Sequence, residues 1–118
     1  MSETEVTLTA IQQAICEFRD ARDWRQFHSP KNLSMSIAIE AAELMEHFQW
    51  LTTDEATHLA RQQGTSRQAI VEELADVLIY CISLADILEC DLNEIILDKL
   101  AKNRTKYPVG PDYGGLKR

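Results

Sequence analysis

Two pairs of acidic residues stand out because each can place two carboxylates on one face of a helix. Glu40 and Glu43 are three residues apart, and so are Glu73 and Asp76. This spacing puts both side chains of a pair on the same helix face, about one turn apart. Glu40 also falls within an apolar stripe at helical spacing, where a carboxylate is costly unless it is paired or binds a metal. The four acids therefore predict a cation held between two facing helices.

Four carboxylates without soft ligands favour a hard divalent cation. All-oxygen sites suit Mg²⁺, with Mn²⁺ as a substitute, and no Cys or His stands at a spacing that would add a zinc ligand. Di-iron bundles use Glu-x-x-His, but His47 follows Glu43 by four residues and Glu46 by one. The remaining alternative is a salt bridge from the acids to basic residues such as Lys99 or Arg104. We favour the metal, because unpaired acids beside a core are costly.

A local concentration of basic and polar side chains lies near the end of the chain, although the net charge is −7. The cluster comprises Lys99, Lys102, Asn103, Arg104, Lys106 and Tyr107. Cations at the end of a helix complement its dipole, and that role is compatible with a second one. Lys99 and Arg104 are the donors best suited to clamp phosphate groups.

Few glycines and prolines interrupt the body of the chain, so helices are expected to position these groups. Apolar spacing predicts four substantial helices and one short helix between the second and third, over about 7–23, 30–51, 54–63, 66–88 and 92–104. Ser29 and Pro30 predict a helix start. Thr53 is expected to cap the short helix, and Thr65 with Gln68 predicts a capping box. The expected fold is all-α, an antiparallel four-helix bundle.

The helix predicted over about 66–88 is apolar around most of its circumference. Ile70, Leu74 and Val77 continue one core stripe, whereas Ile79 and Ile82 lie on other faces. A helix of this kind is buried on more than one side. In a chain this short, a second subunit covers the other side most easily. The sequence therefore predicts a homo-oligomer.

Composition and charge limit the class of protein. The 118 residues fit one domain over 1–118, with a core over about 7–108 and a polar tail over 109–118. The excess of acid argues against nucleic-acid partners, and no apolar run approaches a membrane span. Three cysteines without CxxC spacing, and an acidic N-terminus without a signal pattern, predict reduced thiols and a cytoplasmic location.

With these motifs in place, the chain resembles the MazG-like all-α nucleoside triphosphate pyrophosphohydrolases, most closely their dCTP pyrophosphatase branch. The resemblance covers about residues 21–108. The segments that carry it are Arg22-Asp23-Trp24, Gln26-Phe27-His28, Pro30-x-Asn32-Leu33, Glu40-x-x-Glu43-Leu44, Phe48-Gln49-Trp50, Glu72-Glu73-Leu74-x-Asp76-Val77-Leu78-Ile79-Tyr80 and Asn103-Arg104…Tyr107-Pro108.

The resemblance implies a reaction and a set of site residues. Members of the family are helical bundles that assemble into dimers or tetramers and cleave nucleoside triphosphates to the monophosphate and pyrophosphate. The positions that match the Mg²⁺ ligands of the family are Glu40, Glu43, Glu73 and Asp76. Those that match the nucleotide pocket are Trp24, His28, Trp50 and Tyr80. Those that match the triphosphate or sugar contacts are Lys99, Asn103, Arg104 and Tyr107.

Two features of the site stay open at the level of sequence. One carboxylate would orient or deprotonate the attacking water, with Glu43 as first choice and Glu40 as second. The dCTP-specific members carry a histidine in the first helix that helps recognise the base, whereas this chain has Ile15 there. Hydrolysis of dUTP or phosphoribosyl-ATP is therefore an alternative. A non-enzymatic helical module that binds a nucleotide or a protein partner is another.

Overall fold

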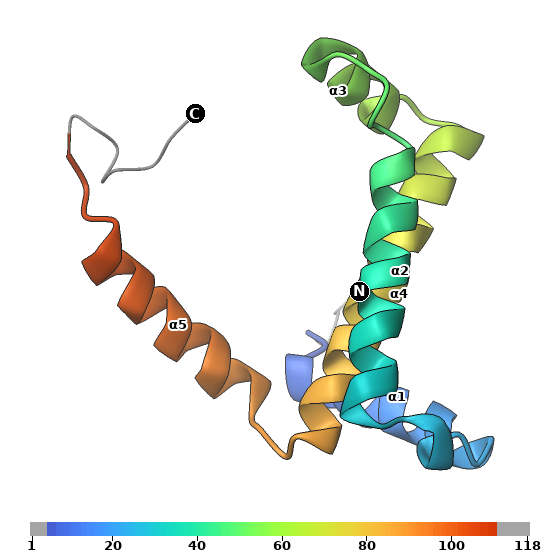
Figure 1. Ribbon diagram of the computed structural model, residues 1–118, viewed down its shortest axis with the longest axis vertical. Coiled ribbons are helices and arrows are strands. Elements are labelled where there is room, and N and C mark those ends of the chain that lie inside the picture. Colours follow the sequence, from blue (N-terminus) through green and yellow to red (C-terminus); the bar gives the residue numbers. More distant parts are fainter. Residues whose placement is uncertain (1–4, 111–118) are drawn as a thin grey trace.

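The computed structural model describes residues 5–110, which are mostly helical (Figure 1). Within this range there are five α-helices, one turn of 3-10 helix and no strand. The elements are α1 (Leu8–Ala21), η1 (Arg25–Phe27), α2 (Pro30–Glu46), α3 (Thr53–Arg61), α4 (Thr65–Ile87) and α5 (Leu92–Lys106). The all-α prediction and the short helix before α4 are confirmed. The predicted polar tail over 109–118 lies outside the described residues from residue 111 onward.

Side chains that accept hydrogen bonds from free backbone N–H groups cap four of the five α-helices, all except α4. Ser29 Oγ accepts a backbone N–H at 3.0 Å, and Pro30 occupies the first position of α2, as predicted. α3 begins one residue earlier than expected, because Thr52 rather than Thr53 is its cap. Thr52 and Glu55 form a reciprocal capping box, which fixes the entry into this short helix.

The predicted capping box of Thr65 and Gln68 is wrong. α4 starts directly after Gly64, whose φ of 143° favours glycine, and no side chain caps the helix. The Gln68 side chain instead donates to Glu72 at 2.7 Å, one helical turn further on. The glycine thus ends the short connection, and α4 extends backward to include Thr65.

The helix pair α2 and α4 positions the acidic residues. These two helices make the most extensive contact in the chain and lie side by side in Figure 1, with α1 packed at one end of α4 and α3 at the other. Leu33 of α2 is 1% exposed, and Ile70, Ile82 and Ala85 of α4 are also buried. This packing sets the acids of α2 against those of α4.

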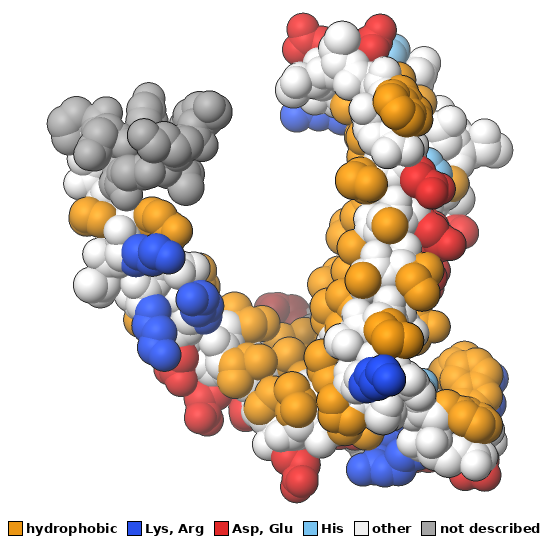
Figure 2. Space-filling view, viewed as in Figure 1, with side chains coloured by type: hydrophobic (Ala, Val, Ile, Leu, Met, Phe, Trp, Pro, Cys, Tyr) orange, Lys and Arg blue, Asp and Glu red, His pale blue; other side chains and the backbone are white. Residues whose placement is uncertain are grey.

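The predicted four-helix bundle is not closed within one chain. α5 forms a separate arm that leaves the end of α4 and runs away from α2 and α3 (Figure 1). The radius of gyration is 17.5 Å, whereas a compact domain of this length has about 13 Å. Figure 2 shows apolar side chains on α5 and on the α2–α4 pair, along the sides that face each other. One chain therefore leaves much of its apolar surface uncovered.

None of the helices between residues 5 and 110 combines the length and hydropathy required to cross a membrane.

Candidate metal and nucleotide site

Three carboxylates converge between α2 and α4. Glu40, Glu73 and Asp76 each place one oxygen within 4.8 Å of the others. Glu40 and Glu73 are half-buried, whereas Asp76 is exposed. Glu43 stands outside this group, although its charge and hydrogen bonding reach both of the other glutamates. The two predicted pairs are thus arranged as three convergent acids with a fourth beside them.

The salt-bridge alternative for these acids is not found in the described part of the chain. The ion pairs there join Arg19 and Arg25 to aspartates, and neither Glu40 nor Glu73 takes part. The acids therefore repel one another without a local counter-charge. Partial burial raises the pKa of Glu40, and raises the pKa of Glu73 to about 7. A hydrogen bond from Glu73 to Glu40 and the charge of Glu43 add to the shift at Glu73.

This titration predicts how the metal-free protein responds to pH. Folding raises the pKa of Glu73 from 4.5 to about 7, so between these values the folded state binds more protons than the unfolded chain. Stability therefore falls as pH rises through that window. Glu73→Gln is expected to flatten this dependence and to raise the melting temperature Tm at pH 8 in EDTA. Thermal unfolding from pH 5 to 8 measures both effects.

The matched control is Glu72→Gln, which changes the neighbouring acid outside the convergent group. It should keep the pH dependence of the wild type. Equal pH profiles for Glu73→Gln and the wild type in EDTA would show that Glu73 does not titrate as described.

The convergent oxygens fit Mg²⁺. Magnesium binds oxygen at about 2.0–2.1 Å, so two oxygens on one ion are at most about 4.2 Å apart. The oxygens of Glu40, Glu73 and Asp76 already lie within 4.8 Å of one another, and all come from hard carboxylates. No Cys or His joins this group among the residues described. The donor set therefore suits Mg²⁺ or Mn²⁺ rather than zinc.

A cavity of about 340 Å³ adjoins the acids at the junction of α1, α2 and α4. Glu40 and Asp76 belong to its wall, so the acids and the cavity form one site. The other residues that line it are Ile15, Phe18, Arg19, Trp24, His28, Ile79, Tyr80 and Ser83. A partly aromatic cavity beside a cation site suits a nucleoside whose phosphates reach the metal.

The aromatic wall of the cavity is held in place by Arg22. Phe18 and Trp24 meet edge to face, with ring centroids 5.5 Å apart. The Arg22 guanidinium lies 3.6 Å from the centroid of Phe18 and 5.9 Å from that of Trp24, and it donates to the Phe18 carbonyl oxygen at 2.9 Å. Such contacts restrict both rings. The segment around Trp24 and His28, which includes η1, thus both packs against the helices and lines the cavity.

Arg19 is a cavity residue that sequence reasoning missed. Its side chain is 3% exposed, which makes it the one buried charged residue among those described. Nη1 donates to Asp86 at 2.7 Å, while Nε and Nη2 donate to Asp20 at 2.8 and 3.3 Å. Two signals point to it in retrospect: Arg19 follows Ile15 by one turn, and Asp86 interrupts the mostly apolar stretch that follows Asp76 in α4.

The remaining predicted residues lie away from the cavity of the same chain. Trp50 follows α2 and is 87% exposed. The predicted phosphate contacts all belong to the arm formed by α5 and none lines the cavity; they are Lys99, Asn103, Arg104 and Tyr107. One chain therefore unites the metal ligands with Trp24, His28 and Tyr80, but it does not bring the basic cluster to them.

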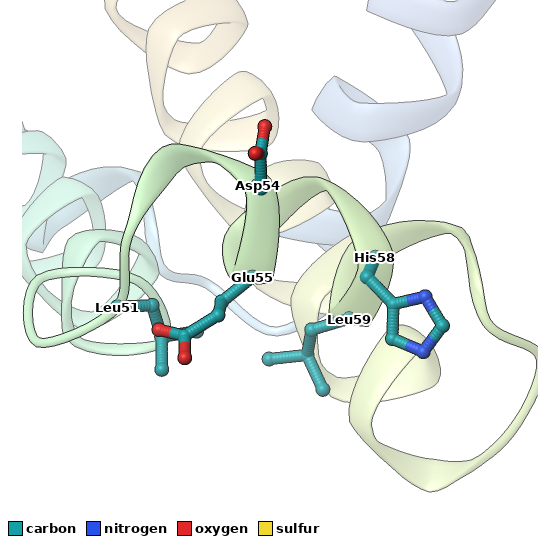
Figure 3. Close-up of a pocket in the computed structure, with 5 residues that line it drawn as sticks. All are labelled: Leu51, Asp54, Glu55, His58 and Leu59. Carbon is teal, nitrogen blue, oxygen red and sulfur yellow. The ribbon is translucent and has the colours of Figure 1, made fainter.

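A second hollow, of about 500 Å³, lies on α3 and contains none of the convergent acids. Figure 3 shows its lining residues, with Leu51, Glu55 and Leu59 along one side, His58 at the end and Asp54 pointing away. Glu55 is occupied as the capping partner of Thr52. This surface has no grouping of polar atoms that would bind phosphates, and the cavity beside the acids remains the candidate site.

Comparisons with known proteins show which family this chain is similar to. A model of the MazG-like family matches residues 35–116. The dCTP pyrophosphatase 1 of Rattus norvegicus is 43% identical over 105 residues, and that of Homo sapiens is 44% identical over 108 residues. These alignments include 89% of this chain and 61% of each relative, so the chain spans about three fifths of the curated relatives it matches.

The fold has a counterpart among solved structures. The crystal structure of a pyrophosphatase from Archaeoglobus fulgidus superposes with a TM-score of 0.80 at 38% sequence identity. The superposition covers 92% of this chain and 99% of the archaeal one. At this identity and coverage, the two chains share one fold over most of their length.

Proposed function

The chain belongs to the MazG-like family, and we propose that it is a Mg²⁺-dependent nucleoside triphosphate pyrophosphohydrolase. Its substrate is a dCTP-like or non-standard (deoxy)nucleotide, and the products are the monophosphate and pyrophosphate. One observation carries the proposal: Glu40 and Asp76 belong both to the convergent acids and to the aromatic-lined cavity. The relatives named dCTP pyrophosphatase 1 support dCTP as the first substrate to test.

The four acids have two different roles at the phosphates. Glu40, Glu73 and Asp76 hold the metal ion, which neutralises phosphate charge and orients the phosphates when bound. Glu43 lies beside the convergent group and not within it, so its carboxylate is free to accept a proton from the attacking water. The aromatic wall holds the nucleoside and thereby keeps the reacting phosphate near the acids.

The phosphate clamp reaches the site from α5 of a second copy. In one chain, α5 carries Lys99 and Arg104 on an arm that projects away from α2 (Figure 1). The same helix exposes several large apolar side chains by 43–62%, namely Ile95, Ile96, Leu97 and Leu100. A dimer or a dimer of dimers would cover these side chains and bring a basic helix to an acidic site.

A charge on the apolar face of α5 is expected to separate the subunits. Leu97→Asp should give a monomer of 13.5 kDa by light scattering and lower kcat/KM by roughly a hundredfold or more, because the clamp donors are lost. Thr105→Asp is the matched control, since it adds the same charge to the same helix on the opposite face, which already carries Asp98. A monomeric wild type, or a monomeric variant with full activity, would contradict this assembly.

A panel of substrates separates the related activities. Release of pyrophosphate from the common deoxy- and ribonucleoside triphosphates, with dUTP included and phosphoribosyl-ATP assayed alongside, identifies the preferred base and sugar. A binding module would hydrolyse none of them, and Mg²⁺ would leave its Tm unchanged. A Tm that rises by several degrees with Mg²⁺ supports the enzyme, because the ion binds the folded state.

We propose the cytoplasm as the compartment of this enzyme. Cys16, Cys81 and Cys90 form no disulfide with one another, and reduced thiols support the cytoplasm as the place where this enzyme acts.

A further inference from the structure

The cavity carries a buried cation at the end away from the metal ligands. Arg19 lies on α1 and Ser83 on α4; their exposed fractions are 3% and 2%, and both line the cavity. His28 lines the same space, and its Nδ1 atom is buried without a hydrogen-bond partner. Burying polar groups is costly unless they meet a partner. This end of the cavity is therefore equipped to receive a polar ligand edge.

Arg19 is held rigidly and still has donors to spare. A guanidinium has five N–H groups. Three of them are used, one from Nε and one from Nη2 to Asp20, and one from Nη1 to Asp86. One N–H on each terminal nitrogen remains without a partner. Asp86 also lies 3.7 Å from Arg25, so cations approach it from two sides.

Arg19 is the only lysine or arginine among the residues that line the cavity. Ile15, one turn earlier on α1, offers only an apolar side chain. Burial and the nearby charge of Arg19 lower the pKa of His28, which disfavours its charged form. Phe18 and Trp24 provide ring faces for stacking, and the indole N–H of Trp24 is the one edge donor they add. A flat ligand held against these rings would turn its polar edge toward Arg19.

We propose that Arg19 is a specificity-determining residue that donates hydrogen bonds to the oxo group of a nucleobase, with Asp20 and Asp86 fixing its orientation. This proposal rests on the proposed function and names its substrate class: nucleotides whose base carries a carbonyl oxygen, such as cytosine, uracil, thymine or guanine. Adenine has an amino group in place of an oxo group, so each acceptor nitrogen on that edge stands beside a donor and matches the two N–H groups of Arg19 less well. Paired arginine hydrogen bonds to a base edge are worth about tenfold to a hundredfold in discrimination.

The test is binding of uncleavable nucleotides, measured by calorimetry in the presence of Mg²⁺. The probes are the α,β-imido analogues of dCTP and dATP. Wild-type protein should bind the cytosine analogue more tightly than the adenine analogue. Arg19→Ala should weaken cytosine binding about tenfold or more and change adenine binding less than about twofold. Arg19→Lys should behave similarly, since it keeps the charge but loses the planar fork.

Two further variants serve as controls for charge and for folding. Arg25→Ala removes an exposed cation near the same Asp86 and should leave the base preference unchanged. The double variant Arg19→Ala/Asp86→Ala removes both partners of the buried pair, and it replaces the single variant if circular dichroism shows that the single variant unfolds.

Several outcomes would overturn the proposal. Equal losses for both analogues would show that Arg19 only supports the fold, and an unchanged preference would show that it does not meet the base. A wild type that binds neither analogue, or binds the adenine analogue as tightly, would also overturn it. Hydrolysis is measured separately. If the protein hydrolyses dCTP but its base preference does not depend on Arg19, the inference about Arg19 is wrong and the proposed function stands. If binding depends on Arg19 but no nucleotide is hydrolysed, the proposed function is wrong and the inference about Arg19 stands.

Discussion

Replacing Glu40 by alanine is expected to lower kcat for nucleotide hydrolysis by roughly a thousandfold or more. Glu40 is the one acid of α2 among the three convergent oxygens, and it also lines the cavity. Without it, the two acids of α4 have no partner on the facing helix to complete the ion site. A lost metal ion removes the main source of charge neutralisation at the phosphates. Pyrophosphate release gives kcat, and calorimetry gives the affinity for Mg²⁺.

Glu46→Ala is the matched control for this variant. Glu46 is an exposed glutamate on α2 that lies outside the convergent group, so its removal should leave turnover and Mg²⁺ affinity within about twofold of the wild type. Circular dichroism should show the same helicity for both variants, because alanine has a high helix propensity at either position. Turnover by Glu40→Ala within tenfold of the wild type would refute the metal site.

Replacing Glu43 by glutamine is expected to lower kcat by about a hundredfold to ten-thousandfold while Mg²⁺ affinity stays within a few fold of the wild type. Glu43 is close enough to raise the pKa of Glu40 and of Glu73, yet it is not among the three convergent oxygens. Glutamine keeps the shape of the side chain but cannot accept the proton from water. The two measurements are kcat and the calorimetric affinity for Mg²⁺.

The comparison between the two variants assigns their roles. Glu40→Ala should lose both metal affinity and turnover, whereas Glu43→Gln should lose turnover alone. If Glu43→Gln loses Mg²⁺ affinity as severely as Glu40→Ala, Glu43 is a ligand and the base lies elsewhere. Full turnover by Glu43→Gln would exclude it from the proton transfer.

The helices and the acid pairs could be predicted because local rules determine them. Ser29 and Pro30 start α2 where N-cap preference and the fixed φ of proline place it. The spacing of three in each acid pair fixes the helix face, so the approach of α2 to α4 is enough to bring the acids together. The end of α2 at Glu46, before the predicted end near Leu51, was missed because Leu44, Phe48 and Leu51 continue the helical apolar spacing past the last helical turn.

Contacts between residues far apart in the sequence could not be predicted from sequence patterns. Arg19 resembles an ordinary surface cation at the end of a helix, and only the fold brings Asp86, 67 residues away, within 2.7 Å of it. The placement of α5 is another case. Its amphipathic sequence predicts a helix with one covered face, but the sequence cannot say whether that face packs within the chain or against a second copy. The structure leaves it uncovered within one chain.

The site assignment depends most directly on which bond is cleaved. We propose that the convergent acids act between the α and β phosphates, and ³¹P nuclear magnetic resonance of dCTP hydrolysis with Mg²⁺ identifies the products. The expected result is equal amounts of dCMP and pyrophosphate, with no reaction in EDTA. Release of dCDP and orthophosphate, or no Mg²⁺-dependent hydrolysis of dCTP or of any other nucleotide in the panel, would contradict the proposed function.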